Sequence, residues 1–367
     1  MKAAEMRVLL TLDSVGGVWQ YGVDLARALG QRGVATVLAH MGPAPSPAQR
    51  AEATLIENGK LIETGLPLDW LVDGPKPIME AGAAVTQLAH DERVDVVQLN
   101  MPTLGASVRA DVPVVAVAHG CVATWWQAVR GDAPLAPEFH WHRLMSGDGL
   151  RAADVVVAPT AAYAQTIARQ YGLSRVPLAI HNGRTPAHEF SVAATSNCVF
   201  TAGRLWDEAK NAALMDRVAS RLPVPFYAAG PVTGPHGETA ALGHLHVLGT
   251  LGQDALRQWL EQQPVFVSAA TFEPFGLAVL EAAQAGCPLV LSDIPTFREL
   301  WDGAALFAAP DSEGEFVSAI ECVTADPALR ASLSAAALDR AADYTPAAMA
   351  GGMLAIYDRV LLHERAA

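Results

Sequence analysis

The sequence predicts an α/β protein built from two domains that each contain a parallel sheet. Short apolar runs typical of buried strands alternate with helical patterns, and this alternation restarts near residue 197 after a polar linker. Apolar strands that alternate with helices of about 10–15 residues indicate βαβ units. The length of 367 residues also agrees with two domains. We expect these domains over 1–185 and 186–343, with a final helical segment over 344–367.

The first half opens with an apolar run over Met6–Leu12 that predicts a buried strand. Gly16-Gly17 follows, and a helical pattern then continues to Gln31, with Gly33 as its C-cap. Further strands are expected over Val34–His40, Val94–Asn100, Pro113–His119 and Asp154–Pro159, and a helix over Thr160–Tyr171. The segment Asn182–Thr195 is polar and carries Gly183 and Pro186, so it predicts the linker between the domains.

The second half repeats the same organisation and ends in a long helix. Strands are expected over Asn197–Ala202, Pro225–Ala229, His246–Gly249, Val265–Ser268 and Pro288–Ser292, and helices over Lys210–Leu222 and Gln253–Gln262. Thr345-Pro346 starts the final helix, with a capping residue before a proline at the first helical position. Its buried face is expected to consist of Met349, Met353, Ile356 and Val360.

Composition and cysteine usage favour a cytoplasmic protein. No apolar stretch approaches the roughly 20 residues of a transmembrane helix, and the residues before Met6–Leu12 are too few for a secretory signal. The four cysteines Cys121, Cys198, Cys287 and Cys322 are scattered and form no C-x-x-C motif. We therefore expect buried, reduced thiols rather than disulfides or a metal site.

The charge is distributed unevenly along the chain. Up to residue 185 there are 15 basic and 17 acidic residues, whereas the rest of the chain has 10 basic and 21 acidic residues. Such an acidic protein is not expected to bind nucleic acid, because binding to phosphate backbones requires a basic surface. The acidic half contains a single lysine, Lys210.

Two carboxylates, Glu273 and Glu281, stand eight residues apart around a helix start. Pro274, Phe275 and Gly276 separate Glu273 from an apolar stretch that begins at Leu277. A loop that leads into a helix turns backbone N–H groups toward a ligand. Because carboxylates accept hydrogen bonds from hydroxyl groups, this pair predicts a site that holds a polyhydroxylated ligand at two points.

The segment from Thr271 to Leu300 closely resembles the signature of retaining family 4 glycosyltransferases of the GT-B fold. The resemblance implies two Rossmann-like domains facing across a cleft, with the C-terminal helix crossing back to the first domain. It implies that Glu273 contacts the donor sugar and that Glu281 contacts the nucleotide ribose. Further contacts to the donor are implied for Gly203, Leu251, Pro274, Phe275, Gly276 and Leu277.

The run from Gly203 to Asn211 follows the first strand of the second half and contains Arg204 and Lys210. Ligands of open α/β domains bind at the carboxyl ends of strands. A lysine at a helix N-terminus opposes the helix dipole, so binding an anion would compensate it; pairing with Asp207 or Glu208 at the surface is the alternative. The family resemblance implies that Arg204 and Lys210 bind the donor diphosphate and stabilise the negative charge of the leaving group.

Two features of the first half also acquire roles from this resemblance. Gly16-Gly17 is not a G-x-G-x-x-G motif, and alone it predicts only a turn. In the family, such a glycine loop approaches the donor phosphates and borders the acceptor. His119 ends a predicted strand, where a capping or core role is the alternative to the contact near the reacting sugar carbon that the family implies. Imidazole suits that contact because it can donate a hydrogen bond while it remains neutral near pH 7.

No metal or cofactor is expected. The chain has no D-x-D motif, and His140-Trp-His142 lacks a third ligand at convincing spacing. The aromatic segment 121–150 predicts a helical excursion packed on the first domain; contact with the acceptor or with a membrane surface are the alternatives.

The resemblance thus implies a metal-independent enzyme that transfers a hexose from a nucleotide-diphosphate sugar with retention of anomeric configuration. The acceptor would be a hydroxyl group of a sugar, a glycan, a lipid-linked molecule or a small molecule. Two alternatives share the fold. A nucleotide-sugar epimerase would need acid/base carboxylates in the first half, where no diagnostic pair occurs. A noncatalytic partner subunit would be free to lose Arg204, Lys210, Glu273 and Glu281, and all four are present.

Overall fold

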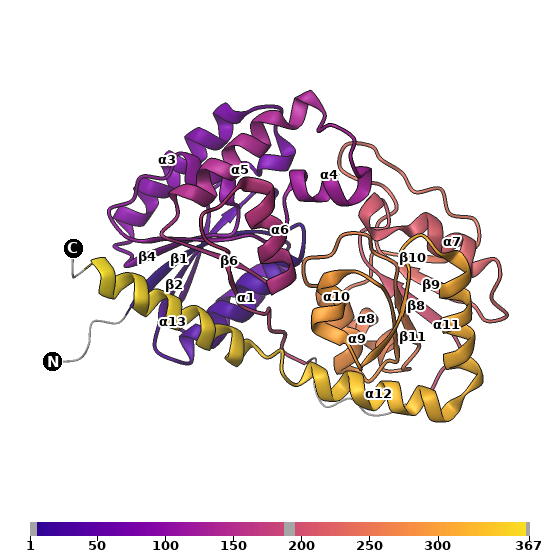
Figure 1. Cartoon of the computed structure of the whole chain (residues 1–367). Coiled ribbons are helices and arrows are strands. Elements are labelled where there is room, and N and C mark those ends of the chain that lie inside the picture. Colours follow the sequence, from indigo (N-terminus) through magenta and orange to yellow (C-terminus); the bar gives the residue numbers. More distant parts are fainter. Residues whose placement is uncertain (1–5, 187–194, 365–367) are drawn as a thin grey trace. The chain divides into compact units, whose positions relative to one another are not determined.

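The computed structural model describes residues 6–186 and 195–364, which form two compact units (Figure 1). Unit 1 comprises residues 6–127, 132–184 and 345–364, and unit 2 comprises residues 128–131, 185–186 and 195–344. The chain therefore leaves unit 1, forms unit 2 and returns to unit 1 for its last helix. Residues 1–5 and residues 187–194 of the expected linker lie outside the described residues.

Unit 1 contains a parallel sheet with the strand order β3-β2-β1-β4-β5-β6-β7 among the described residues. The direction of strand succession reverses between β1 and β4, which are neighbours in the sheet. Such a switch point leaves a crevice outside the carboxyl ends of the two strands. The strands are β1 (Arg7–Asp13), β2 (Ala35–Met41), β3 (Gly59–Glu63), β4 (Val96–Leu99), β5 (Val114–Val117), β6 (Val155–Ala158) and β7 (Leu178–Ala179).

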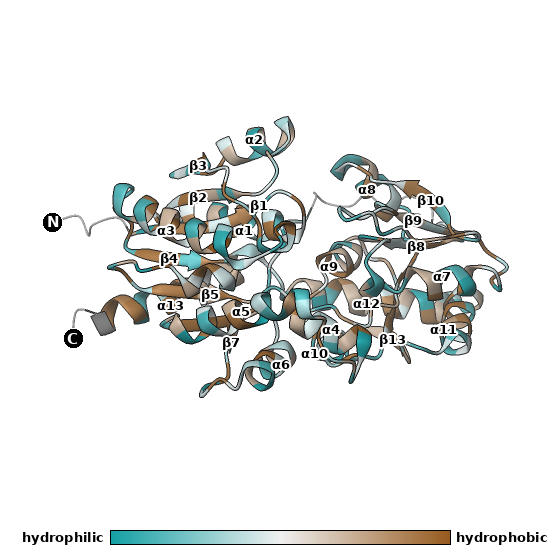
Figure 2. Cartoon of the chain, turned by 90° about the horizontal axis from the view of Figure 1, so that it is seen from above, coloured by the Kyte–Doolittle hydropathy of each residue, from teal (hydrophilic) through white to brown (hydrophobic). Residues whose placement is uncertain are grey.

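Helices cover both faces of this sheet. One core joins the sheet to α1 and α13, and a second core joins it to α3, α5 and η2. Figure 2 shows both hydrophilic and hydrophobic residues on α1, and ten of its 14 residues are buried. The helices are α1 (Gly17–Gly30), α2 (Pro47–Thr54), η1 (Asp69–Leu71), α3 (Pro75–Asp91), η2 (Pro102–Ala106), α4 (Val122–Arg130), η3 (Pro137–Phe139), α5 (His140–Ala152), α6 (Ala161–Tyr171) and α13 (Pro346–Glu364).

Helix α13 completes the core of unit 1, although it follows unit 2 in the sequence. The expected face of Met349, Met353, Ile356 and Val360 is buried, and Tyr357 is buried with it. These side chains share one core with Trp19, Leu25 and Leu29 of α1; Figure 1 shows α13 beside α1. The prediction of a C-terminal helix that returns to the first domain is confirmed.

Unit 2 has a parallel sheet with the order β10-β9-β8-β11-β12-β13 in the described part of the chain. Its switch point lies between β8 and β11. One core packs α9, α10 and α12 against the sheet, and another packs α7 and α11 against it. The elements are β8 (Val199–Ala202), η4 (Glu208–Lys210), α7 (Ala212–Ala219), β9 (Phe226–Ala229), β10 (His246–Gly249), α8 (Gln253–Leu260), β11 (Val265–Ser268), α9 (Leu277–Gln284), β12 (Leu289–Ser292), α10 (Pro295–Trp301), β13 (Ala305–Ala308), α11 (Glu313–Ala325) and α12 (Pro327–Ala341).

Some expectations from the sequence are wrong in detail. The helix expected to begin at Lys210 begins at Ala212, because Asn211 adopts a left-handed conformation with φ of 57°. Lys210 instead ends the short 3-10 turn η4. The four cysteines are free, as expected, but only Cys198 and Cys287 are buried, whereas Cys121 is half-buried and Cys322 is exposed.

Candidate active site

The clearest candidate site lies in unit 2, where the loops after β8 and β11 meet. Because β8 and β11 are neighbours at the switch point, both loops emerge from the same edge of the sheet. The backbone N–H of Thr271 donates to the carbonyl oxygen of Ala209 over 2.9 Å, which ties one loop to the other. The geometry of the sheet thus brings together residues that are more than 60 positions apart in the sequence.

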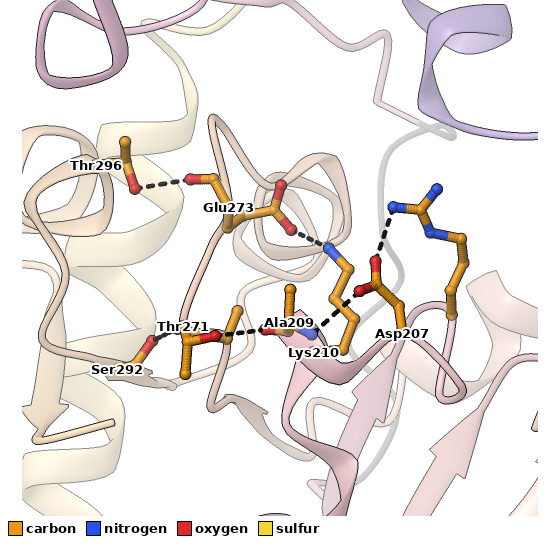
Figure 3. Close-up of polar contacts among 9 residues, drawn as sticks. Asp207, Ala209, Lys210, Thr271, Glu273, Ser292 and Thr296 are labelled. Carbon is orange, nitrogen blue, oxygen red and sulfur yellow. Dashed lines mark hydrogen bonds and ion pairs between the residues drawn. The ribbon is translucent and has the colours of Figure 1, made fainter. Parts of the chain in front are cut away.

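Lys210 and Glu273 face each other across these two loops (Figure 3). The Lys210 ammonium donates to a carboxylate oxygen of Glu273, and both side chains are about one fifth exposed. Thr296 on α10 donates its hydroxyl to the backbone carbonyl of Glu273 over 2.7 Å. The site therefore presents a cation and an anion side by side, and both remain accessible to a ligand.

A second cation, Arg204, is held next to this pair by Asp207. The Arg204 guanidinium donates to Asp207 over 2.9 Å, and the Asp207 side chain is 6% exposed whereas that of Arg204 is 48% exposed. The other carboxylate oxygen of Asp207 accepts from the backbone N–H of Ala209 over 3.0 Å. The guanidinium also lies 5.6 Å from the ring centre of Trp206, within cation–π range. Asp207 thus fixes Arg204 and the turn that carries Lys210.

The loop after Glu273 has the conformation expected for a helix start. Gly276 has φ of 92° and directly precedes α9, a backbone conformation that side chains rarely tolerate. Leu277 begins α9, and Glu281 lies half-buried one turn further along it. The Phe275 side chain packs against the Tyr344 ring with a centroid distance of 5.7 Å. Pro274 and Phe275 are buried, and Leu251 lies half-buried after β10.

The expected site residues of unit 1 lie at the carboxyl edge of its own sheet. Asp13 ends β1 and accepts hydrogen bonds from the backbone N–H groups of Val15 and Gly16, over 2.8 and 3.2 Å. Gly16 is the N-cap of α1 and Gly17 its first residue. A Cβ atom built on Gly16 would meet no atom within 4 Å, so this residue borders open space. The glycine loop therefore starts a helix, as the sequence predicts.

His119 follows β5 and contacts Asn100, which follows β4, and Tyr21 of α1. Its Nε2 lies 3.0 Å from Oδ1 of Asn100, which follows β4. Its ring packs edge-on against Tyr21 with a centroid distance of 4.4 Å. Burial lowers the pKa of His119 to about 4, so the imidazole is neutral at pH 7.

Sequence reasoning missed several residues that shape these sites. The sequence offers Asp207 only as a surface partner of Lys210, whereas in the structure it is buried and holds Arg204. Gly230, after β9, has φ of 137°, and a Cβ atom there would lie 1.7 Å from the carbonyl oxygen of Gly203. Its position after a strand and before Pro231 was the available signal. Asn100 carried no recognisable motif, because only the sheet brings it next to His119.

The aromatic segment and the histidines near it have structural partners. His142 pairs with Asp69 over 3.1 Å, both side chains being less than a tenth exposed, and Thr103 donates to the same Asp69 carboxylate. Trp126 packs against Phe139 with a centroid distance of 5.9 Å. No group of three His, Cys, Asp or Glu side chains within residues 6–186 and 195–364 could hold a metal ion. None of the helices in the described ranges combines the length and the hydropathy that a membrane span requires.

Two units with parallel sheets, and a last helix that returns to the first unit, match the architecture of the GT-B class of glycosyltransferases. The family model of glycosyltransferase family 4 matches residues 15–187, and that of the group 1 glycosyl transferases matches residues 196–326. The chain therefore belongs to the family 4-like glycosyltransferases of the GT-B fold. The expectation drawn from the signature is confirmed at this level.

Solved structures agree with this fold assignment. Sucrose-phosphate synthase from Thermosynechococcus elongatus has a TM-score of 0.77 and 16% identity, covering 98% of this chain and 100% of that one. HepE from Anabaena, in complex with UDP and glucose, has a TM-score of 0.73 and 17% identity, covering 96% and 100%. A glycosyltransferase from Rickettsia africae has a TM-score of 0.73 and 14% identity, covering 98% and 99%. A comparison with curated protein sequences finds no match.

Proposed function

We propose that this protein transfers a hexose from a nucleotide-diphosphate sugar to a hydroxyl acceptor with retention of anomeric configuration, without a metal ion or other cofactor. The observation that carries the proposal is the meeting of Lys210, Glu273 and the Asp207-held Arg204 at the β8/β11 switch point. A nucleotide-diphosphate sugar combines an anionic diphosphate with a polyhydroxylated ring. Two cations beside an accessible carboxylate match both parts of such a ligand.

The cations supply the electrostatic part of the reaction. Breaking the bond between the anomeric carbon and the diphosphate leaves negative charge on the leaving oxygen. Arg204 and Lys210 stabilise this charge, and they require little reorganisation because Asp207 and Glu273 hold them in place. Metal independence is proposed on these two cations and on the lack of a D-x-D motif. Turnover should persist in excess EDTA; a loss that Mg²⁺ or Mn²⁺ restores would contradict this part.

The remaining residues hold the donor and guide the transfer. In this proposal Glu273 accepts hydrogen bonds from sugar hydroxyls, and Glu281 accepts them from the ribose. Gly203, Leu251, Pro274, Phe275, Gly276 and Leu277 border the donor, and Gly16 and Gly17 border its phosphates and the acceptor. The buried Phe275 side chain leaves its backbone as the part that could contact a ligand.

The retaining chemistry is proposed to take place on one face of the sugar. The departing phosphate oxygen accepts the proton of the acceptor hydroxyl, whose oxygen bonds to the anomeric carbon as the diphosphate leaves. His119 lies near the reacting carbon in this scheme. A product formed from an α-linked donor should show an α linkage by proton NMR, and a β product would refute retention.

Thermal-shift screening against UDP-, GDP- and ADP-sugars tests the donor class. A donor at 100 times its Kd should stabilise the protein by about 2.7 kcal/mol. The same donor should release its nucleoside diphosphate only when an acceptor or water takes the sugar. Absence of stabilisation by every nucleotide sugar would refute the proposal, and recovery of an epimerised donor would instead favour an epimerase.

A further inference from the structure

A buried chain of polar side chains runs from the last helix of unit 1 to His119. Tyr357 on α13 donates its hydroxyl to Oε1 of Gln98 on β4. Nε2 of Gln98 donates to Oδ1 of Asn100 over 3.0 Å and to the hydroxyl of Tyr21 over 3.2 Å. Asn100 in turn contacts His119. Gln98 and Tyr357 are fully buried and Asn100 is 7% exposed, so these polar groups have little access to water as an alternative partner.

The orientation of the Asn100 amide is set by the backbone of β1. Nδ2 of Asn100 donates to the carbonyl oxygen of Thr11 over 2.7 Å, and the Thr11 hydroxyl accepts from the Asn100 backbone N–H over 2.9 Å. A flipped amide would place two oxygen atoms against each other at Thr11 and two NH₂ groups against each other at Gln98. Because both contacts would become repulsive, Oδ1 must be the atom that faces His119.

This orientation decides where the proton of His119 lies. Oδ1 of Asn100 can only accept a hydrogen bond, so Nε2 of His119 must be the donor. A neutral imidazole carries one proton, which leaves Nδ1 as an acceptor. Among the described residues, no hydrogen-bond partner of Nδ1 is present. The sequence suggested that His119 donates to the ligand, but the structure directs its N–H to Asn100.

We propose that Asn100 is a positioning residue that holds His119 with its proton on Nε2, so that Nδ1 accepts a hydrogen bond from a hydroxyl group of the donor sugar. The ligand part of this inference rests on the proposed function; the proton position does not. In this proposal His119 recognises an uncharged hydroxyl group of the sugar. A ligand carboxylate at Nδ1 would find no hydrogen-bond donor, because the only N–H of the His119 ring is at Nε2.

NMR of the full-length protein labelled with ¹⁵N-histidine tests the proton position directly. Loss of one ring signal among the 11 histidines in His119→Gln identifies the His119 resonances. We expect the Nε2 signal to show a bonded proton and the Nδ1 signal to show none at pH 7. A proton on Nδ1 in the unaltered protein would overturn the proposal, whatever its activity.

Variants at two positions of the chain separate positioning from simple packing. Asn100→Ala should allow both tautomers of His119 to be populated, and Asn100→Asp should raise the pKa of His119 because a carboxylate stabilises the imidazolium. Tyr357→Phe is the control, because Tyr357 is separated from Asn100 by two hydrogen bonds through Gln98. This variant should retain the Nε2 tautomer of His119, because Thr11 still orients Asn100. An unchanged tautomer and pKa in both Asn100 variants would contradict the proposal.

Kinetics with UDP-glucose as the donor test the ligand part. Asn100→Ala should lower kcat about tenfold, the scale of one neutral hydrogen bond, with a smaller change in the donor KM. If the tautomer is as expected but kcat does not change in either Asn100→Ala or His119→Gln, the ligand role of His119 is refuted. If the unaltered protein transfers no sugar at all, the proposed function fails while the assignment of the proton stands.

Discussion

At the scale of single residues, Lys210 has to interact with both a carboxylate and the proposed diphosphate. In the structure it pairs with Glu273, and in the proposed reaction it also binds the diphosphate. Because an ammonium group has three N–H donors, it can keep its carboxylate partner while it binds an anion. Arg204 is in the same position, since Asp207 uses only part of its guanidinium. Both cations are thus held in place by carboxylates and retain donors for a ligand.

We expect Arg204→Ala and Lys210→Ala to lose turnover while remaining folded. Removing one charged hydrogen-bond partner should cost about 1.5–3 kcal/mol of transition-state stabilisation, or roughly 10- to 150-fold in rate. Steady-state kinetics with saturating donor measures the effect, and circular dichroism checks folding. Arg217→Ala is a matched control, because Arg217 pairs with Glu313 in the same unit away from the site. Unchanged rates in both site variants would contradict the assignment.

Substitutions of Glu281 and Glu273 should have different effects, one on nucleotide binding and the other on sugar transfer. Glu281→Gln is expected to weaken binding of the free nucleoside diphosphate, because it removes the acceptor proposed for the ribose. Glu273→Gln should leave that affinity nearly unchanged and reduce transfer instead. Calorimetry with the nucleoside diphosphate measures the first effect and initial rates the second. The reverse order of effects would exclude this division of roles.

At the scale of elements, the strand order explains why the sites form where they do. Each sheet has its polar loops at the strands where its order reverses: β1 and β4 in unit 1, and β8 and β11 in unit 2. In unit 2 the loop after β8 also approaches the loop after β9, and this close approach depends on glycine. Gly230 packs so tightly on Gly203 that no side chain fits between them.

Gly230→Ala should therefore impair both stability and turnover. Its Cβ atom would overlap the Gly203 carbonyl at 1.7 Å, and its φ of 137° strains any other residue. We expect a loss of at least about 1–3 kcal/mol in the free energy of unfolding, measured by denaturant titration, and slower transfer because Gly203 precedes Arg204. Gly243→Ala is the control, since a Cβ atom there meets nothing within 4 Å. Equal stability of the two variants would show that the loop adapts.

Much of this organisation can be predicted from the sequence, and its limits have physical causes. The buried strands β1, β5, β8 and β11 were predicted because parallel strands covered on both faces are continuous apolar runs. The strand β3 was missed because Gly59–Glu63 is short, polar and only half-buried at the sheet edge. Motif resemblance predicts Lys210, Glu273 and His119 as site residues, whereas Asn100 and Gly230 contact neighbours that are distant in sequence, which no local pattern encodes.

At the scale of the whole molecule, the half-buried His119 and the buried His40 make stability depend on pH. Burial lowers the pKa of His119 to about 4 and that of His40 below its ordinary value. An unfolded histidine has a pKa of about 6.5, so below this pH the unfolded chain binds more protons than the folded one. The free energy of unfolding should therefore be fully retained above about pH 6.5 and should decline as the pH falls toward 4.

Denaturant titrations between pH 4 and pH 7 measure this dependence. His119→Gln should flatten it, because the glutamine side chain does not titrate. His90→Gln is the control, since His90 lies exposed at the end of α3. If the free energy of unfolding depends on pH equally in the original protein and in His119→Gln, then His119 does not contribute to this dependence. The carboxylates with lowered pKa values, such as Asp216 and Asp293, act in the lower range, below about pH 4.

The return of α13 to unit 1 also determines the order in which the chain can mature during synthesis. Domains generally fold as units while the ribosome extends the chain. Unit 2 has all of its described residues once position 344 has emerged, whereas the core of unit 1 still lacks Met349, Met353 and Tyr357. We therefore expect the unit encoded in the middle of the sequence to complete its core first. The apolar face of α1, although it is translated early, stays without its partner until translation has passed α13, and during that interval it is the surface on which a chaperone could act.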